Sequence, residues 1–178
     1  MIKMLIIKEG IIMKKLLCVC ISLVLVLSLC TSCSSSPKDF TWNGLTITLT
    51  STFVEHEVTN ESASYANYFK TYVVVISYET VQSLVDLGYD ADMTVEEYAV
   101  LSIEANEFDA EVKTVDGVTY YNYTGDADGT EYTYMATVHL QGNSFWMVQF
   151  ASQSTDYEAA EPEFLAWAKT VTYTEATE

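Results

Sequence analysis

The chain has 178 residues, with 25 Asp and Glu against 8 Lys and Arg, and its formal net charge is −17 at pH 7. This charge excludes nucleic acid as an expected partner, because phosphate contacts depend on Lys and Arg. Anionic lipid headgroups and anionic wall polymers should be repelled, whereas cations and basic partners are favoured. A simple role of the acidic residues in solubility would also account for the charge.

Near the amino terminus, Met13–Ser36 has charged, apolar and small polar parts in that order. Lys14 and Lys15 form a positive n-region, and Leu16–Leu29 is an uncharged apolar run. The run fits the roughly 7–15 residues of a secretory h-region. It is shorter than the roughly 18 residues that indicate a membrane-spanning helix. The segment therefore predicts export.

The residues Cys30-Thr31-Ser32-Cys33 resemble the lipobox of bacterial lipoproteins, with Cys30 in place of the usual Leu. This resemblance implies cleavage after Ser32 and a diacylglyceryl group, with acyl chains such as palmitate, on the Cys33 thiol. Two acyl chains hold a protein stably at a membrane. We therefore expect a lipoprotein anchored in the cell membrane on its extracytoplasmic face. Ordinary secretion and an uncleaved signal anchor are the alternatives.

The chain is predicted to have three segments: a signal peptide over 1–32, a lipidated Cys33 with a Ser-rich tether over 33–38, and one domain over 39–178. The codons of Lys8-Glu9-Gly10 would be purine-rich, like a ribosome-binding site, so we expect Met13 to be the true start. The mature chain has 146 residues (178 minus 32) and a net charge of −20 (four Lys against 24 acidic residues). It is long enough for one real core.

The first half of the domain is predicted to consist mostly of strands. Phe40–Trp42 and Leu45–Leu49 flank Asn43-Gly44, which indicates a hairpin because both turn residues accept positive φ. Thr52–Ser64 is polar and mixed, and we expect a loop or an edge strand there. Tyr72–Glu79 is rich in β-branched and aromatic residues, which predicts a central strand.

A helix is predicted after an irregular stretch over Val81–Asp92. Thr94-Val95-Glu96-Glu97 is a capping box, and the helix should end near Asn106. Helical spacing predicts one apolar face, formed by Val95, Tyr98, Leu101 and Ala105. The acidic residues of this helix are expected to face solvent.

An antiparallel meander is predicted next. Asp109–Val115 should pair with Val118–Tyr123 across Asp116-Gly117. Glu131–Leu140 should follow as a strand with one apolar face, made of Tyr132, Tyr134, Ala136, Val138 and Leu140. Phe145–Phe150 is apolar on both faces, which predicts a middle strand of a sheet covered on two sides.

The carboxyl-terminal part is predicted to be a polar connection, a helix and a short strand. The connection covers Ala151–Ala160, and Glu161-Pro162 should begin the helix, since Pro is tolerated in a first turn. The packing face of this helix is expected to contain Phe164, Leu165, Trp167 and Ala168. Val171–Tyr173 should form the last strand.

No catalytic constellation is found in the sequence, and we therefore expect no enzyme. A Ser-His-acid triad would need His56 or His139, and no Gly-x-Ser-x-Gly elbow is present. His56 lies between Glu55 and Glu57, but adjacent strand residues point to opposite faces and cannot easily bind one metal. His139 is expected to be a packed or surface residue. A small hydrolase is the disfavoured alternative.

An acidic segment, Gly125–Glu131, is the candidate metal site of the sequence. Asp126, Asp128 and Glu131 offer hard oxygen ligands of the kind that calcium prefers. The segment begins like a calcium-binding loop, but it lacks the Glu that an EF-hand places at its twelfth position. A turn made of good turn residues is the simpler interpretation.

The order of elements resembles the PsbP-like fold, named for an extrinsic accessory protein of photosystem II. The similar segments are the F-x-x-x-G-L-x-I of Phe40–Ile47, the T-V-E-E-Y of Thr94–Tyr98, the strand Phe145–Phe150 and the F-L-x-W-A-K-x-V of Phe164–Val171. The resemblance implies an α+β fold, with a central antiparallel sheet between helices in an α/β/α sandwich. It also implies a non-enzymatic binding or accessory module, whose partner is an unknown protein or small molecule.

Overall fold

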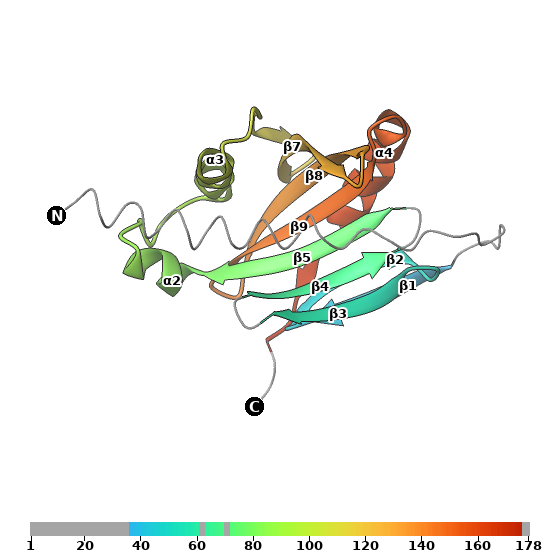
Figure 1. Cartoon of the computed structure of the whole chain (residues 1–178). Helices are drawn as coiled ribbons and strands as arrows, with labels where there is room; N and C mark the ends of the chain where they lie inside the picture. The colour runs from blue at the N-terminus through green and yellow to red at the C-terminus, as the bar shows by residue number, and fades with distance from the viewer. Residues whose placement is uncertain (1–35, 61–62, 70–71, 176–178) are drawn as a thin grey trace.

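The computed structural model describes residues 36–60, 63–69 and 72–175. Their strands form a seven-stranded sheet and a three-stranded sheet (Figure 1). The order of the large sheet is β3 (Val54–Asn60), β4 (Ala63–Phe69), β5 (Val73–Thr80), β9 (Ser144–Gln153), β8 (Thr130–Gln141), β7 (Val118–Ala127) and β6 (Lys113–Val115). Every neighbouring pair in it is antiparallel. The α+β class and the antiparallel sheet are confirmed.

The small sheet contains the predicted amino-terminal hairpin and the predicted last strand. Its order is β1 (Pro37–Trp42), β2 (Leu45–Thr50) and β10 (Thr172–Tyr173). Asn43 and Gly44 have φ angles of 49° and 89°, as a primed turn requires. The alternation of β2 buries Leu45, Ile47 and Leu49. The two ends of the domain are therefore joined in one sheet.

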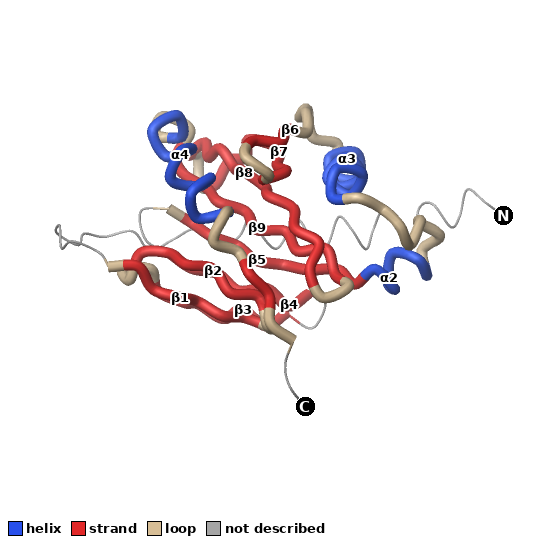
Figure 2. Tube along the Cα trace, turned by 180° about the vertical axis from the view of Figure 1, so that it is seen from behind, coloured by secondary structure: helices blue, strands red, loops and turns tan. Residues whose placement is uncertain are grey.

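The large sheet is packed on both faces. Side chains that alternate along β9 point to one face and then to the other. Phe145 faces α3 (Val95–Asn106), where it stacks on Tyr98 with ring centroids 4.5 Å apart. Phe150 faces α4 (Tyr157–Ala168), where its ring centroid lies 5.4 Å from that of Phe164. The small sheet shares the core of the α4 face, beside α4 in Figure 2. The predicted helices therefore lie on opposite faces of the sheet.

The predicted capping box of α3 is confirmed, and the predicted packing face is confirmed in part: Tyr98 is buried, and Val95 and Leu101 pack against the same core cluster. The Thr94 side chain accepts from the Glu97 backbone, and the Glu97 carboxylate accepts from the Thr94 backbone at 2.8 Å. The buried residues of α3 are Tyr98, Ala99, Ser102 and Ile103. The prediction did not include Ala99, Ser102 and Ile103. Of these, Ser102 is a buried polar residue whose hydroxyl is hydrogen-bonded to Tyr121.

The stretch predicted to be irregular contains a helix, α2 (Val81–Asp86). Thr80 caps its first turn by accepting from the Ser83 backbone at 3.1 Å. At its end, Gly88 N–H donates to Val85 and Tyr89 N–H donates to Leu84, which is a Schellman motif. Gly88 has a φ of 94°, so a glycine suits this left-handed position.

Several boundaries of elements, and the exposure of one residue, also differ from those predicted. β9 extends to Gln153 and α4 begins at Tyr157, so Pro162 lies inside the helix rather than in its first turn. Its side chain is exposed, which lets the proline ring project away from the core. In the meander, β6 contains only Lys113–Val115. At the end of β8, Leu140 is 43% exposed, because it lies at the strand end next to the turn.

The leader, the lipobox and Cys33 lie outside the described residues. β1 begins at Pro37, two residues before the predicted start of the domain. Within residues 36–60, 63–69 and 72–175, no helix has the length and apolar character needed to span a membrane.

Candidate functional site

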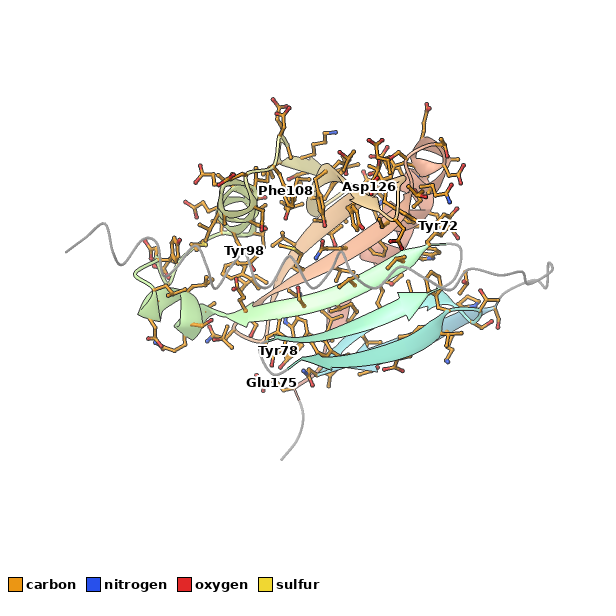
Figure 3. The ribbon with its side chains drawn as sticks, in the orientation of Figure 1. Tyr72, Tyr78, Tyr98, Phe108, Asp126 and Glu175 are labelled. Carbon is orange, nitrogen blue, oxygen red and sulfur yellow. The ribbon has the colours of Figure 1, made fainter. Side chains whose placement is uncertain are left out.

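The predicted calcium ligands lie where β7 turns into β8 (Figure 3 labels Asp126). Asp126 and Glu131 are directly paired across the strands, and the turn itself is Asp128-Gly129, with a φ of 53° at Asp128. Asp126 Oδ1 accepts from Gly129 N–H at 3.0 Å, so one candidate oxygen already serves the turn. The predicted loop is thus mostly strand.

The described residues contain no group of three or more His, Cys, Asp or Glu side chains placed to hold a metal ion. Asp126 and Glu131 share one face of the sheet as a consequence of their direct pairing. Calcium binding at Asp126, Asp128 and Glu131 stays a prediction.

His139 lies in β8, and its environment is that of a packed residue. Its Nε2 atom lies 3.0 Å from Thr137 Oγ1, and that hydroxyl also donates to the Val148 carbonyl at 3.0 Å. The Thr137 hydroxyl therefore accepts from an Nε2–H. Burial lowers the pKa of His139 to about 4. Thr137 is fully buried, so the hydroxyl that His139 contacts is not accessible to a substrate.

The other histidine lies on the edge strand β3, where His56 is paired with Asn67 of β4. The sequence allowed a loop or an edge strand here, and the structure has the strand.

Two tyrosine hydroxyls are held beneath α3. Tyr98 donates to Glu79 Oε2 at 2.7 Å, and Tyr121 is hydrogen-bonded to Ser102 at 2.7 Å (Figure 3 shows Tyr98 between α3 and the sheet). Burial raises the pKa of Tyr98, with the Glu79 charge adding to the effect. Burial also raises the pKa of Tyr121 to about 12. Both hydroxyls are therefore protonated at neutral pH, and both are engaged in internal contacts.

A second pair of tyrosines lies between α4 and β7. Tyr157 donates to Asn122 Oδ1 at 2.9 Å, and Tyr120 donates to Glu161 Oε1 at 3.4 Å. Burial raises the pKa of Tyr157, and the negative charge of Glu161 raises it further. These groups attach the first turns of α4 to the sheet. Their hydroxyls, like those beneath α3, are used in packing contacts.

Exposed large apolar side chains occur on several elements, and three of them belong to α2 and the turn after it. Val85, Leu87 and Tyr89 are 36%, 48% and 37% exposed, although they lie within five positions of the chain. Acidic residues alternate with them in the same stretch, namely Asp86, Asp90 and Asp92. We call these six residues the α2 surface. It lies at one end of the large sheet, beyond β5 (Figure 1).

Sequence reasoning missed the α2 surface because it did not identify the helix. The signals were present: Thr80 stands three residues before Ser83, and Gly88 follows the short apolar segment at the position of a helix C-terminus. The sequence does not indicate that Val85 and Leu87 are exposed, because apolar residues are usually expected to be buried.

This geometry defines an α+β domain with an antiparallel sheet between helices. Known proteins are similar to it in this fold. No family model matches the sequence, and no curated protein sequence matches it.

The solved structures that are similar include the following three. A protein from Bacteroides thetaiotaomicron VPI-5482 has a TM-score of 0.50 and 16% identity, over 79% of this chain and 50% of that chain. CyanoP, the cyanobacterial PsbP of Synechocystis sp. PCC 6803, has a TM-score of 0.46 and 14% identity, over 83% and 99%. A protein of unknown function from Pseudomonas aeruginosa has a TM-score of 0.45 and 11% identity, over 79% and 99%.

The likeness concerns the fold alone, because all three identities are low. The chain matches half the length of the Bacteroides protein. One of these structures, CyanoP, is a cyanobacterial PsbP, and the order of elements in the sequence resembles the PsbP-like fold. No activity, partner or site residue follows from this similarity.

Proposed function

We propose that this protein is a lipoprotein anchored in the cell membrane on its extracytoplasmic face, and that its domain acts as a non-enzymatic binding or accessory module. The anchor is supported by the leader and the lipobox-like Cys30–Cys33. The binding role is supported by the α2 surface, which carries the proposal: three large apolar side chains within five positions of the chain are exposed. Exposed apolar groups rimmed by polar residues are typical of interaction sites.

The side chains that could in principle take part in catalysis also support a non-enzymatic role. His139 is paired with a buried threonine, and Tyr98, Tyr121 and Tyr157 direct their hydroxyls to internal partners. In these contacts the groups stabilise the fold. A catalytic group would instead need to reach a substrate within hydrogen-bond distance.

The anchor is tested by fatty-acid labelling of the full chain in a bacterial host that processes lipoproteins. An alkyne-bearing fatty acid should label the wild-type protein, and Cys33→Ser should lose the label and leave the membrane fraction. Cys30→Leu is the matched control, because it removes a neighbouring thiol, gives the lipobox its usual Leu and should keep the label. Label that persists in Cys33→Ser, or a mature protein with an unmodified amino terminus, would contradict the anchor.

The binding role is tested separately by pull-down from solubilised membranes. The full chain should enrich a partner over a control that carries only the leader, the lipid anchor and the tether. Leu87→Ser should reduce this enrichment, whereas Val100→Ser, at a residue that is 45% exposed on α3, should not. Equal recovery with the anchor-only control would remove the support for a binding module.

A further inference from the structure

The backbone of α2 is held at both of its ends, although the helix is short. Leu84 is buried in the core beneath α3 and attaches α2 to the sheet. The Thr80 cap at the start and the two Schellman hydrogen bonds at the end define both helix termini. Val81 N–H also donates to the Asn143 carbonyl at 3.0 Å, which ties α2 to the β8–β9 turn. A partner would meet a preorganised surface and would pay little ordering entropy.

The charge of this surface is negative and is not neutralised locally. Asp86 and Asp92 are exposed, and Asp90 is exposed as well. The described lysines, Lys38, Lys113 and Lys169, belong to β1, to β6 and to the end of α4. A partner that covered the apolar side chains would therefore bring its own charges close to uncompensated carboxylates.

We propose that the α2 surface docks a basic segment of another protein, in which Lys or Arg side chains flank apolar anchors. The inference rests on the proposed function as a binding module and names its partner class. Apolar anchors would cover Val85, Leu87 and Tyr89, and the basic groups would pair with Asp86 and Asp92. Charge complementarity of this kind speeds association and selects the partner.

The same charges disfavour the other occupants. A second copy of this chain would bring like charges together, because the chain carries a net charge of −17. An anionic bilayer surface would be repelled for the same reason. The basic protein segment is the occupant that satisfies both the apolar and the acidic residues.

A designed peptide probe tests the proposal on the full chain held in nanodiscs of zwitterionic lipid. The probe is a helical Lys/Leu peptide of about 18 residues with one apolar stripe and a benzophenone group on that stripe. Its partner control replaces every Lys by Glu, and its lipid control is an empty nanodisc. Crosslinked positions are mapped by mass spectrometry. If the chain proves to be unanchored, the same measurement is made without nanodiscs, so that the anchor and the docking surface are decided separately.

The expected result is crosslinking of the Lys/Leu peptide concentrated on residues 82–92 and absent for the Glu/Leu peptide. Val85→Ser combined with Leu87→Ser should reduce the yield by about tenfold, whereas Val100→Ser with Val115→Ser, at exposed sites on α3 and β6, should not. Asp86→Asn with Asp92→Asn should reduce the yield and its sensitivity to salt while keeping the apolar residues.

Several outcomes would overturn the proposal. Crosslinks spread evenly over the acidic surface would show non-specific charge attraction. A yield unchanged by the Val85/Leu87 variant, with its fold verified by circular dichroism, would show that these side chains are not the anchors. Equal labelling by the Glu/Leu peptide would exclude selection for basic residues, and crosslinks between two copies of the chain would favour self-association.

Discussion

Tyr98 donates a hydrogen bond of 2.7 Å to Glu79 Oε2, and this contact links α3 to the end of β5, next to α2. The Tyr98 ring stacks on Phe145 with an interplanar angle of 1°, so one side chain fills the core and also pairs with a carboxylate. Tyr98→Phe should keep the stacking and remove only the hydrogen bond. We expect a loss of about 1–2 kcal/mol in the free energy of unfolding, because the acceptor is charged. Denaturant titration measures this loss.

Glu79→Gln is the matched variant for this contact, because an amide oxygen can still accept from Tyr98. It should cost less than Tyr98→Phe. Equal stability of Tyr98→Phe and the wild type would show that the hydrogen bond contributes nothing net.

Alkaline pH should destabilise the fold through its buried tyrosines. The pKa values of Tyr98 and Tyr121 are raised above the ordinary 10.0, that of Tyr121 to about 12. Above pH 10 the unfolded state releases protons that the folded state keeps, so stability falls as pH rises. Tyrosinate absorbance and circular dichroism, followed together, should show a fraction of the tyrosines ionising only as the protein unfolds. Complete ionisation before unfolding would contradict the burial.

The calcium prediction for Asp126, Asp128 and Glu131 is decided by calorimetric titration of the full chain with calcium. Binding at the turn would give heat in the parent protein that is lost in Asp126→Asn and in Asp128→Asn. Glu104→Gln, at an exposed acid on α3, is the control that should leave such heat unchanged. No heat in the parent protein would end the prediction and leave the segment as a hairpin turn.

The sequence was informative wherever local chemistry decides the structure. Asn43-Gly44 and Asp116-Gly117 are primed turns with positive φ at both residues, and the capping box at Thr94 starts α3 where predicted. The two-sided apolar pattern of Phe145–Phe150 correctly predicted a middle strand, because both faces of β9 are covered.

The failures arose where tertiary contacts override local pattern. Ser102 is buried because Tyr121 satisfies its hydroxyl, and no residue near it in the chain indicates this. Pro162 marked a helix start by its usual preference, but α4 begins at Tyr157, where the Tyr157–Asn122 hydrogen bond attaches the first turn to β7. The α2 surface could not be found from pattern alone, since exposure depends on what the rest of the fold leaves uncovered.

The stability of α2 should depend on its amino-terminal cap. Thr80 accepts from Ser83 N–H at 3.1 Å, so Thr80→Ala should cost about 1 kcal/mol, as loss of a helix cap usually does. Faster hydrogen exchange of the amides of Leu87, Gly88 and Tyr89, whose acceptors lie in α2, would report this loss. Thr80→Ser keeps a hydroxyl and should exchange like the wild type. Unchanged exchange in Thr80→Ala would mean that Leu84 packing alone holds α2.

Acid should destabilise the fold through His139. Its pKa is lowered by burial from 6.5 to about 4, so between these values the unfolded state binds more protons than the folded state. Stability due to this residue is therefore complete above pH 6.5 and is lost as pH falls, with a slope of at most about 1.4 kcal/mol per pH unit. Denaturant titrations between pH 4 and 7 measure the slope.

A comparison of variants separates His139 from the many carboxylates that titrate in the same range. His139→Leu removes the titrating group, and Thr137 keeps its hydrogen bond to the Val148 carbonyl, so the hydroxyl is not left without an acceptor. The stability of His139→Leu should depend less steeply on pH than that of the wild type between pH 4 and 6.5. If His139→Leu and the wild type have parallel pH profiles, His139 is protonated in the folded state, and the neutral, packed imidazole inferred from its burial is wrong.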